Sequence, residues 1–300
     1  SLAAGTVAAG GTLGIMIPPS MAMIIYGIIT ENSIAKLFIA GLLPGLFISA
    51  MLIVFILLRG LIWPASVGAS QESRAAQLEI SSQTTFLQDM GVIFPPLILI
   101  GIILGSIYTG TATPTEAAGV GAVGAFVLLL AKRRLNWTLL KSILRQSART
   151  SSMIICLIFG GMTLSYVVSY LGLAQAMADI IIGMGVNKYV LICCIYLLWF
   201  ILGCLIDPLS MIILTVPFMY PTLMRLGFDP LWLAVVSTLA VEMGMITPPV
   251  GLNLFVIKGI SSVPMGQIIR GVVPFLGVLI FCLAVLTIFP KIALVLPYNM

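Results

Sequence analysis

The sequence predicts an all-α protein that crosses a membrane several times. Hydrophobic residues make up 61% of the 300 residues, whereas charged residues make up only 8%. The mean hydropathy is +1.22, far outside the range of soluble globular proteins. A bilayer core has no water to satisfy free backbone groups, so α-helices are the expected spanning elements in a chain this apolar. The composition therefore excludes a soluble domain, and the positive charge does not imply nucleic-acid binding.

Apolar runs mark the predicted helices in chain order. Most are long enough to cross a hydrocarbon core about 30 Å thick, but several are short or interrupted. The runs cover residues 37–58, 91–109, 115–131, 151–171, 189–206, 231–256 and 270–290. The short and interrupted runs predict a re-entrant hairpin and broken helices beside the full spans.

A cluster of basic residues orients the chain. Six of the fourteen lysines and arginines are Lys132, Arg133, Arg134, Lys141, Arg145 and Arg149. The positive-inside rule places this loop in the cytoplasm. Residues 136–150 alternate apolar and basic side chains, which favours an amphipathic helix on the inner membrane surface over a solvated run of charges.

A double proline that follows a glycine occurs twice. The segments Gly14 to Pro19 and Gly244 to Pro249 align at an offset of 230, and the alignment extends without a gap to Gly41 and Gly271. The chain therefore contains a duplicated unit. When the spans are alternated outward from the cytoplasmic loop, the two copies have opposite orientations, as in the inverted repeats of many secondary transporters.

The prolines predict breaks in membrane helices. A proline inside a helix removes a hydrogen bond and costs about 3 kcal/mol or more. The freed carbonyl groups must then find partners in a cavity or in the protein. We therefore expect Pro18, Pro19, Pro248 and Pro249 to break two helices at a binding site near the bilayer midplane.

Two acids lie in the apolar segments of the second copy. Asp207 precedes Pro208, which is the pattern of a helix start, but an acid near the bilayer centre is also a candidate cation ligand. Glu242, Thr247 and Asn253 add oxygen donors that suit Na⁺. In the simpler alternative, Glu242 only bonds a neighbouring helix and the prolines only kink the chain. The first copy has no acid.

Other motifs indicate structure rather than a site. The segment Thr113 to Glu116 has the order of a capping box, with proline at the first helical position. The five cysteines lie in apolar runs without metal-ligand spacing, and the chain has no histidine. Nothing in the sequence calls for a cofactor or for a metal other than a coupling Na⁺.

Four motifs in order resemble the large membrane subunit of tripartite ATP-independent periplasmic (TRAP) transporters, the DctM-like family. They are Gly10 to Ser20, Thr111 to Ala118, Asp207-Pro208 and Gly244 to Leu254. The resemblance runs from residue 1 to about residue 297. It implies an elevator-type, sodium-coupled importer of C4-dicarboxylates, sialic acid or similar organic acids, and no enzyme activity.

The resemblance also implies partners and a location. The expected partners are a small membrane subunit, a soluble periplasmic binding protein that delivers the substrate, and the lipid bilayer. The expected location is the inner membrane of a bacterial or archaeal cell.

Site residues follow from the resemblance position by position. The Na⁺ ligands that it implies are Asp207, Gly244, Thr247 and Val250, with Gly11 and Gly14 in the first copy. The expected substrate contacts are Ser20, Ser210, Pro248 and Asn253.

The resemblance divides the chain into four parts. Residues 1–60 are the second part of the first repeat, 61–90 a cytoplasmic connection, 91–186 scaffold helices with the arm 136–150, and 187–300 the second repeat. The family's first hairpin has no counterpart before the first break. We therefore expect the chain to be a fragment that lacks an N-terminal portion.

Two other functions compete with this hypothesis. A stand-alone, ion-coupled dicarboxylate or anion carrier would share the inverted-repeat architecture but would need no binding protein. An intramembrane hydrolase would use Asp207 and Glu242 as an acid pair, which requires the two carboxyl groups to lie within hydrogen-bond reach.

Overall fold

The computed structural model describes residues 2–62, 86–185, 187–261 and 263–299. Within these ranges all regular elements are α-helices. Five helical segments are long and apolar enough to cross a membrane: Leu2–Thr30, Ile34–Ile62, Pro114–Ala131, Trp137–Tyr170 and Met265–Ile288. Ile93–Tyr108, Lys188–Gly203 and Pro230–Met245 are shorter apolar helices. The prediction of an all-α, polytopic membrane protein is confirmed.

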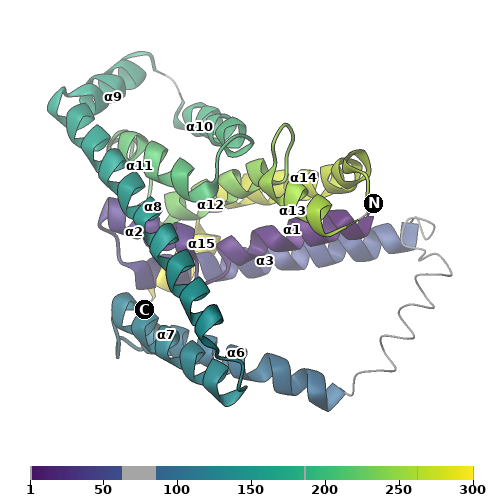
Figure 1. The fold of residues 1–300 in the computed structure, drawn as a ribbon. Helices are drawn as coiled ribbons and strands as arrows, with labels where there is room; N and C mark the ends of the chain where they lie inside the picture. The colour runs from purple at the N-terminus through teal and green to yellow at the C-terminus, as the bar shows by residue number, and fades with distance from the viewer. Residues whose placement is uncertain (1, 63–85, 186, 262, 300) are drawn as a thin grey trace. The chain divides into compact units, whose positions relative to one another are not determined.

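The described residues form two compact units, residues 1–58 with 151–300 and residues 59–150. The helices of the first unit are α1 (Leu2–Met16), α2 (Met21–Thr30), α3 (Ile34–Ile62), α9 (Leu173–Gly183), α10 (Lys188–Gly203), α11 (Pro208–Arg225), α12 (Pro230–Met245), α13 (Leu252–Ile260), α14 (Met265–Ile288) and α15 (Lys291–Tyr298) (Figure 1). The C-terminal end of α3 extends past the boundary at residue 58.

Helix α12 forms the core of the first unit. All its residues from Leu231 to Met245 are buried, as expected for a helix that is apolar on every side. It packs against α10, α14 and α1. The indole nitrogen of Trp232 donates a hydrogen bond of 2.8 Å to the Leu286 carbonyl, which ties the start of α12 to the end of α14.

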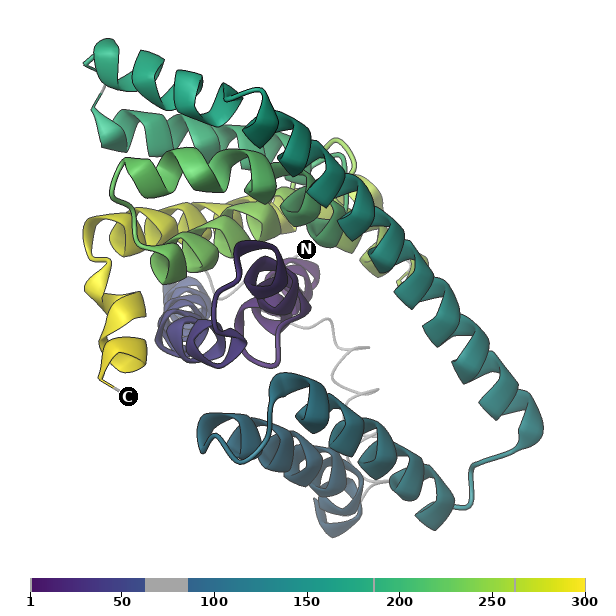
Figure 2. The same cartoon turned by 90° about the vertical axis from the view of Figure 1, so that its left-hand side faces the viewer.

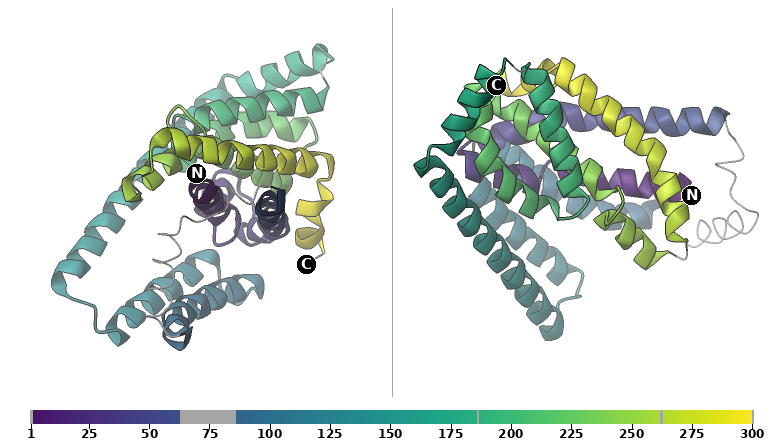
Figure 3. Two further views of the ribbon diagram at one scale, coloured as in Figure 1. Left: turned by 90° about the vertical axis from the view of Figure 1, so that its right-hand side faces the viewer. Right: turned by 90° about the horizontal axis from the view of Figure 1, so that it is seen from above.

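The N-terminal helices pack on C-terminal ones. Helix α1 packs on α14, which it crosses at an angle in Figure 3, and a Cβ atom at Gly5 would lie 2.1 Å from the carbonyl oxygen of Gly271. Small residues allow membrane helices to approach this closely. Helix α2 packs on α11, and the Tyr26 hydroxyl donates a 3.0 Å bond to the Pro230 carbonyl. The two ends of the chain thus share one core.

The second unit contains α6 (Phe86–Tyr108) and α7 (Pro114–Ala131), which pack on each other. Glycine makes room for large side chains here, since Cβ atoms at Gly121 and Gly124 would meet Ile103 and Leu99. The predicted capping box is confirmed: the Glu116 amide donates to Thr113, and the Glu116 carboxylate accepts from the Thr113 amide at 2.7 Å.

Helix α8 (Trp137–Tyr170) is one unbroken helix of 34 residues (Figure 2). The sequence predicts an amphipathic arm at 136–150 and a separate span at 151–171, but the helix has no interruption between them. Asn136 caps its start, where its side-chain oxygen accepts the Leu139 amide at 2.7 Å. Of the predicted connection 61–90, residues 63–85 lie outside the described residues.

Candidate functional site

The second double proline lies in a gap between two helices. Helix α12 ends at Met245 and α13 begins at Leu252, with residues 246–251 in turns. The Pro248–Pro249 peptide bond is cis. Gly251 has a φ of +53°, and a Cβ atom there would lie 2.9 Å from the Thr247 carbonyl oxygen. Because both features disfavour a side chain, the backbone can close this turn only with glycine.

The first double proline lies in a matching gap between α1 and α2. Pro18–Pro19 is also cis, and Ser20 caps α2 by accepting the Met23 amide at 3.3 Å. Helix α3 packs closely on this gap, because a Cβ atom at Gly41 would lie 2.9 Å from the Met16 carbonyl oxygen. Each copy therefore has a helix, a double-proline gap, a second helix and then a long helix.

A sharp turn at residues 204–207 joins α10 to α11 and forms the tip of a helical hairpin. Asp207 is the N-cap of α11, and Pro208 is its first residue. One carboxylate oxygen accepts the Ser210 amide at 3.0 Å, and the other accepts the Ser210 hydroxyl at 2.5 Å. The helix-start interpretation of Asp207 is confirmed, and Asp207 and Ser210 lie together in the half-buried tip.

The hairpin tip lies directly against the second break. A Cβ atom at Gly244 would lie 2.6 Å from the Gly203 Cα, so the ends of α10 and α12 touch backbone to backbone. The Gly251 amide also points to the Cys204 carbonyl at 3.4 Å. Two glycines thus allow segments about forty residues apart in sequence to touch. Main-chain oxygens lie close to the contact.

The remaining predicted ligands of the second copy lie in or beside the break. Thr247 is half-buried and its hydroxyl donates to the Met243 carbonyl at 2.7 Å, while its amide donates to the Gly244 carbonyl at 3.0 Å. Val250 is half-buried in the turn, and Pro248 is exposed. The threonine hydroxyl keeps its lone pairs available, because it acts as the donor in its hydrogen bond.

The first copy also reaches this region, because α1 packs on both α12 and α13. A Cβ atom at Gly11 of α1 would lie 3.8 Å from the side-chain nitrogen of Asn253 in α13, so these two predicted site residues are neighbours. A Cβ atom at Gly14 would have no atom within 4 Å. Ser20 is fully buried and serves as a cap. No hydrogen bond between described residues links Ser20 or Gly14 to the second break.

Glu242 lies one turn before the second break and is only 1% exposed. Its Oε1 atom has no hydrogen-bond partner among the described residues. An ionised carboxylate buried without a partner costs several kcal/mol. The predicted alternative, in which Glu242 only bonds a neighbouring helix, gains no support from this oxygen. Glu242 was not among the Na⁺ ligands implied by the resemblance. Only the folded structure shows that its side chain is buried and that Oε1 has no partner among the described residues.

Family comparison connects this geometry to a known class of protein. Residues 1–292 match the sequence profile of the family described as "Tripartite ATP-independent periplasmic transporter, DctM component". The chain belongs to this family. The match spans both double-proline breaks and the hairpin, so the resemblance predicted from the four motifs is confirmed.

Curated relatives align with almost the whole chain. The C4-dicarboxylate TRAP transporter large permease protein DctM of Pseudomonas aeruginosa is 34% identical over 295 residues, which cover 98% of this chain and 67% of the relative. The sialic acid TRAP transporter large permease protein SiaM of Vibrio cholerae is 31% identical, with coverages of 98% and 67%. The isethionate TRAP transporter permease protein DctMQ of Oleidesulfovibrio alaskensis is 29% identical, with coverages of 96% and 44%. These relatives are named as permeases, and the TRAP chain described here is a multi-pass membrane protein of that type.

Proposed function

We propose that this TRAP chain forms the ion-binding and substrate-moving part of a sodium-coupled importer of small organic anions. The contact between the hairpin tip and the second helix break carries the proposal. It brings Gly203 and Cys204 of the tip against Gly244 and Gly251 of the break, and Asp207 follows three residues later. In secondary transporters, unwound backbone and half-helix ends of this kind coordinate Na⁺.

The electrostatics of the contact favour a cation. The C-terminal end of α12 at Met245 carries the negative end of the helix dipole. Beyond it, the turn that contains Thr247 and Val250 presents main-chain oxygens outside the α-helical hydrogen-bond pattern. Asp207 in the tip and Glu242 just before the break add negative charge or proton-binding capacity. We assign the principal Na⁺ site to Asp207, Gly244, Thr247 and Val250.

The first copy supplies a weaker cation site and part of the substrate contact. Gly11 and Gly14 lie on α1 without an acid nearby in sequence. Gly11 approaches Asn253, which supports a shared site for the two breaks. We place the substrate contacts at Ser20, Ser210, Pro248 and Asn253, where the two serines would use lone pairs that their capping bonds leave free.

The directions of the long helices support an inverted repeat. The start of α3 lies at the Pro230 end of α12, because α2 and the turn after it bond Pro230 and Tyr220. Helix α14 instead ends there, since Trp232 bonds Leu286. The equivalent helices α3 and α14 therefore cross the unit in opposite directions, which fits an elevator-type carrier whose repeats face opposite sides.

The names of the relatives point to the substrate class. C4-dicarboxylates, sialic acid and isethionate differ in size, but each carries a carboxylate or a sulfonate. We propose a small organic acid as the substrate, with a small membrane subunit and a periplasmic binding protein as partners. The proposed location is the bacterial inner membrane. The proposal requires no cofactor and no nucleic acid.

Transport by the complete complex tests the proposal. We expect proteoliposomes that contain the full-length permease and its small subunit to accumulate succinate, sialic acid or isethionate only with an inward Na⁺ gradient and the binding protein. Replacing Na⁺ by K⁺, with and without an inward proton gradient, separates sodium coupling from proton coupling. Ion-driven uptake that needs no binding protein would instead establish the stand-alone carrier.

The hydrolase alternative finds no support at the site. The Asp207 carboxylate bonds Ser210, and the Glu242 Oε1 has no partner, so no hydrogen bond joins the two acids in the described structure.

A further inference from the structure

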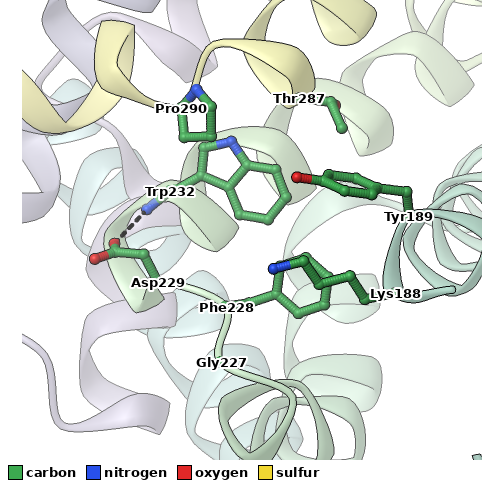
Figure 4. Close-up of a pocket in the computed structure, with 8 residues that line it drawn as sticks. All are labelled: Lys188, Tyr189, Gly227, Phe228, Asp229, Trp232, Thr287 and Pro290. Atoms are coloured by element: carbon green, nitrogen blue, oxygen red, sulfur yellow. Dashed lines mark hydrogen bonds between the residues drawn. The ribbon is translucent and has the colours of Figure 1, made fainter.

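A cavity with both polar and apolar lining residues lies at the end of α12 opposite to the helix break. It has a volume of about 190 Å³, and the residues that shape it include Lys188, Tyr189, Phe228, Asp229, Trp232 and Thr287 (Figure 4). Trp232 stands in the first turn of α12, whereas the break follows the last turn of this helix at Met245. The cavity is therefore separate from the candidate ion site.

The cavity lies where three apolar helices end. Helix α10 begins at Lys188, α12 begins at Pro230, and α14 ends at Ile288. The side chains beside it are apolar and exposed, with Val190 54%, Ile288 68% and Phe289 58% exposed. Such side chains need lipid around them, and aromatic residues concentrate where membrane meets water. The cavity thus opens at the boundary between acyl chains and headgroups.

Lys188 gives the cavity a cation that forms no ion pair within 4 Å in the described structure, although the Asp229 carboxylate also lines the cavity. Lys188 is exposed, and its amine lies 5.6 Å from the Tyr189 ring centre and 5.9 Å from that of Phe228. Figure 4 shows the Lys188 amine and the Tyr189 hydroxyl directed toward the space beside the Trp232 indole. These two donors can converge on one acceptor.

Asp229 is already engaged on another side. One of its oxygens accepts the amides of Leu231 and Trp232 at 2.8 and 3.0 Å, and the other accepts the Tyr298 hydroxyl. This last bond raises the pKa of Tyr298 to about 12, so the phenol remains a neutral donor at physiological pH. Three donors thus bind the Asp229 carboxylate. The Lys188 amine makes none of these bonds and faces the cavity.

We propose that this cavity binds the phosphate of a phospholipid headgroup, with Lys188 and Tyr189 as donors and Phe228 and Trp232 as the wall. The two rings stack at 5.5 Å and 10°, which makes that wall flat and rigid. The volume equals that of about six water molecules, so it holds a phosphate and the first atoms attached to it. Phospholipid is favoured over a soluble phosphate because exposed apolar side chains, those of Val190, Ile288 and Phe289, adjoin the lining residues in sequence. The inference does not depend on the transport function.

Native mass spectrometry of the full-length complex tests this site. Dioleoyl phosphatidylglycerol is titrated onto the detergent-purified protein, and dioleoylglycerol, which has the same chains without phosphate, is titrated in parallel. We expect phosphatidylglycerol to bind at least five-fold more tightly than dioleoylglycerol. Lys188→Gln should weaken phosphatidylglycerol binding at least three-fold, and Tyr189→Phe should weaken it less.

The matched control is Lys36→Gln. Lys36 is another exposed lysine, near the start of α3 and at the same end of the unit, but it does not line the cavity. Equal losses in Lys188→Gln and Lys36→Gln would show only general charge attraction and would overturn the site, as would equal binding of the two lipids. Displacement of the lipid by millimolar glycerol 3-phosphate would assign the cavity to a soluble phosphate instead.

Discussion

Asp207 combines a structural bond with a charge in a half-buried position. Its carboxylate caps α11 through the amide and the hydroxyl of Ser210. Asparagine can cap a helix about as well as aspartate, but it brings no negative charge. The two roles can therefore be separated by substitution at this one residue.

We expect Asp207→Asn to keep the stability of the protein and Asp207→Ala to lose about 1 kcal/mol. Both variants should raise the Na⁺ concentration for half-maximal uptake about ten-fold, since loss of a charged ligand worth about 1.4 kcal/mol has that effect. Thermal unfolding in detergent and Na⁺ titration of uptake measure the two effects. If Asp207→Asn kept the wild-type Na⁺ affinity, Asp207 would serve only as the N-cap of α11 and not as a Na⁺ ligand.

The contact between α10 and α12 sets the position of the hairpin tip relative to the second break. Gly203 and Gly244 let the backbones touch, and this approach holds the hairpin tip against the break. A methyl group at either position has no space unless the helices separate. Moving them apart would displace the tip from the turn that contains Thr247.

Gly244→Ala should therefore destabilise the protein by roughly 1 to 3 kcal/mol, the usual cost of overpacking. It should also weaken Na⁺ binding by shifting the tip away from the break. Gly277→Ala is the matched control, because Gly277 lies within α14 and a Cβ atom there meets nothing within 4 Å. Equal unfolding temperatures for the two variants would contradict the close contact.

At the largest scale, α3 and α14 run in opposite directions across the first unit. Lys36 and Gly266 occupy equivalent places in the two copies, at an offset of 230, and both are exposed at the starts of these helices. An inverted repeat places them on opposite sides of the membrane. From the positive-inside rule, we expect Lys36 to face the periplasm and Gly266 to face the cytoplasm.

Single cysteines at these positions test the topology of the complete protein. In a background without the five native cysteines, a membrane-impermeant maleimide should label Lys36→Cys in intact spheroplasts and Gly266→Cys only after lysis. Arg134→Cys, in the basic loop, should behave like Gly266→Cys. Labelling of Lys36→Cys and Gly266→Cys from the same side would exclude the inverted repeat.

Local sequence was sufficient to predict much of the chain. Proline positions predicted gaps at Pro18–Pro19 and Pro248–Pro249, and both proline pairs lie outside helices. Proline alone does not explain these gaps, because the adjacent Pro95 and Pro96 lie inside α6. Capping chemistry predicted the starts of α7 and α11. The continuity of α8 across residues 150 and 151 was not predicted, because a change from amphipathic to apolar composition does not require a break in the backbone.

Composition and motif order were enough to establish the membrane class and the family. The duplicated unit and the Na⁺ ligands at the second break stay predictions from motif spacing. The packing of the helices was needed to show that Gly203 meets Gly244, that Gly11 lies beside Asn253 and that Glu242 is buried with an unpaired oxygen. The cavity at Lys188 also emerged only from the fold. Such features join residues that are distant in the chain, and their contacts depend on how helices pack rather than on any local pattern.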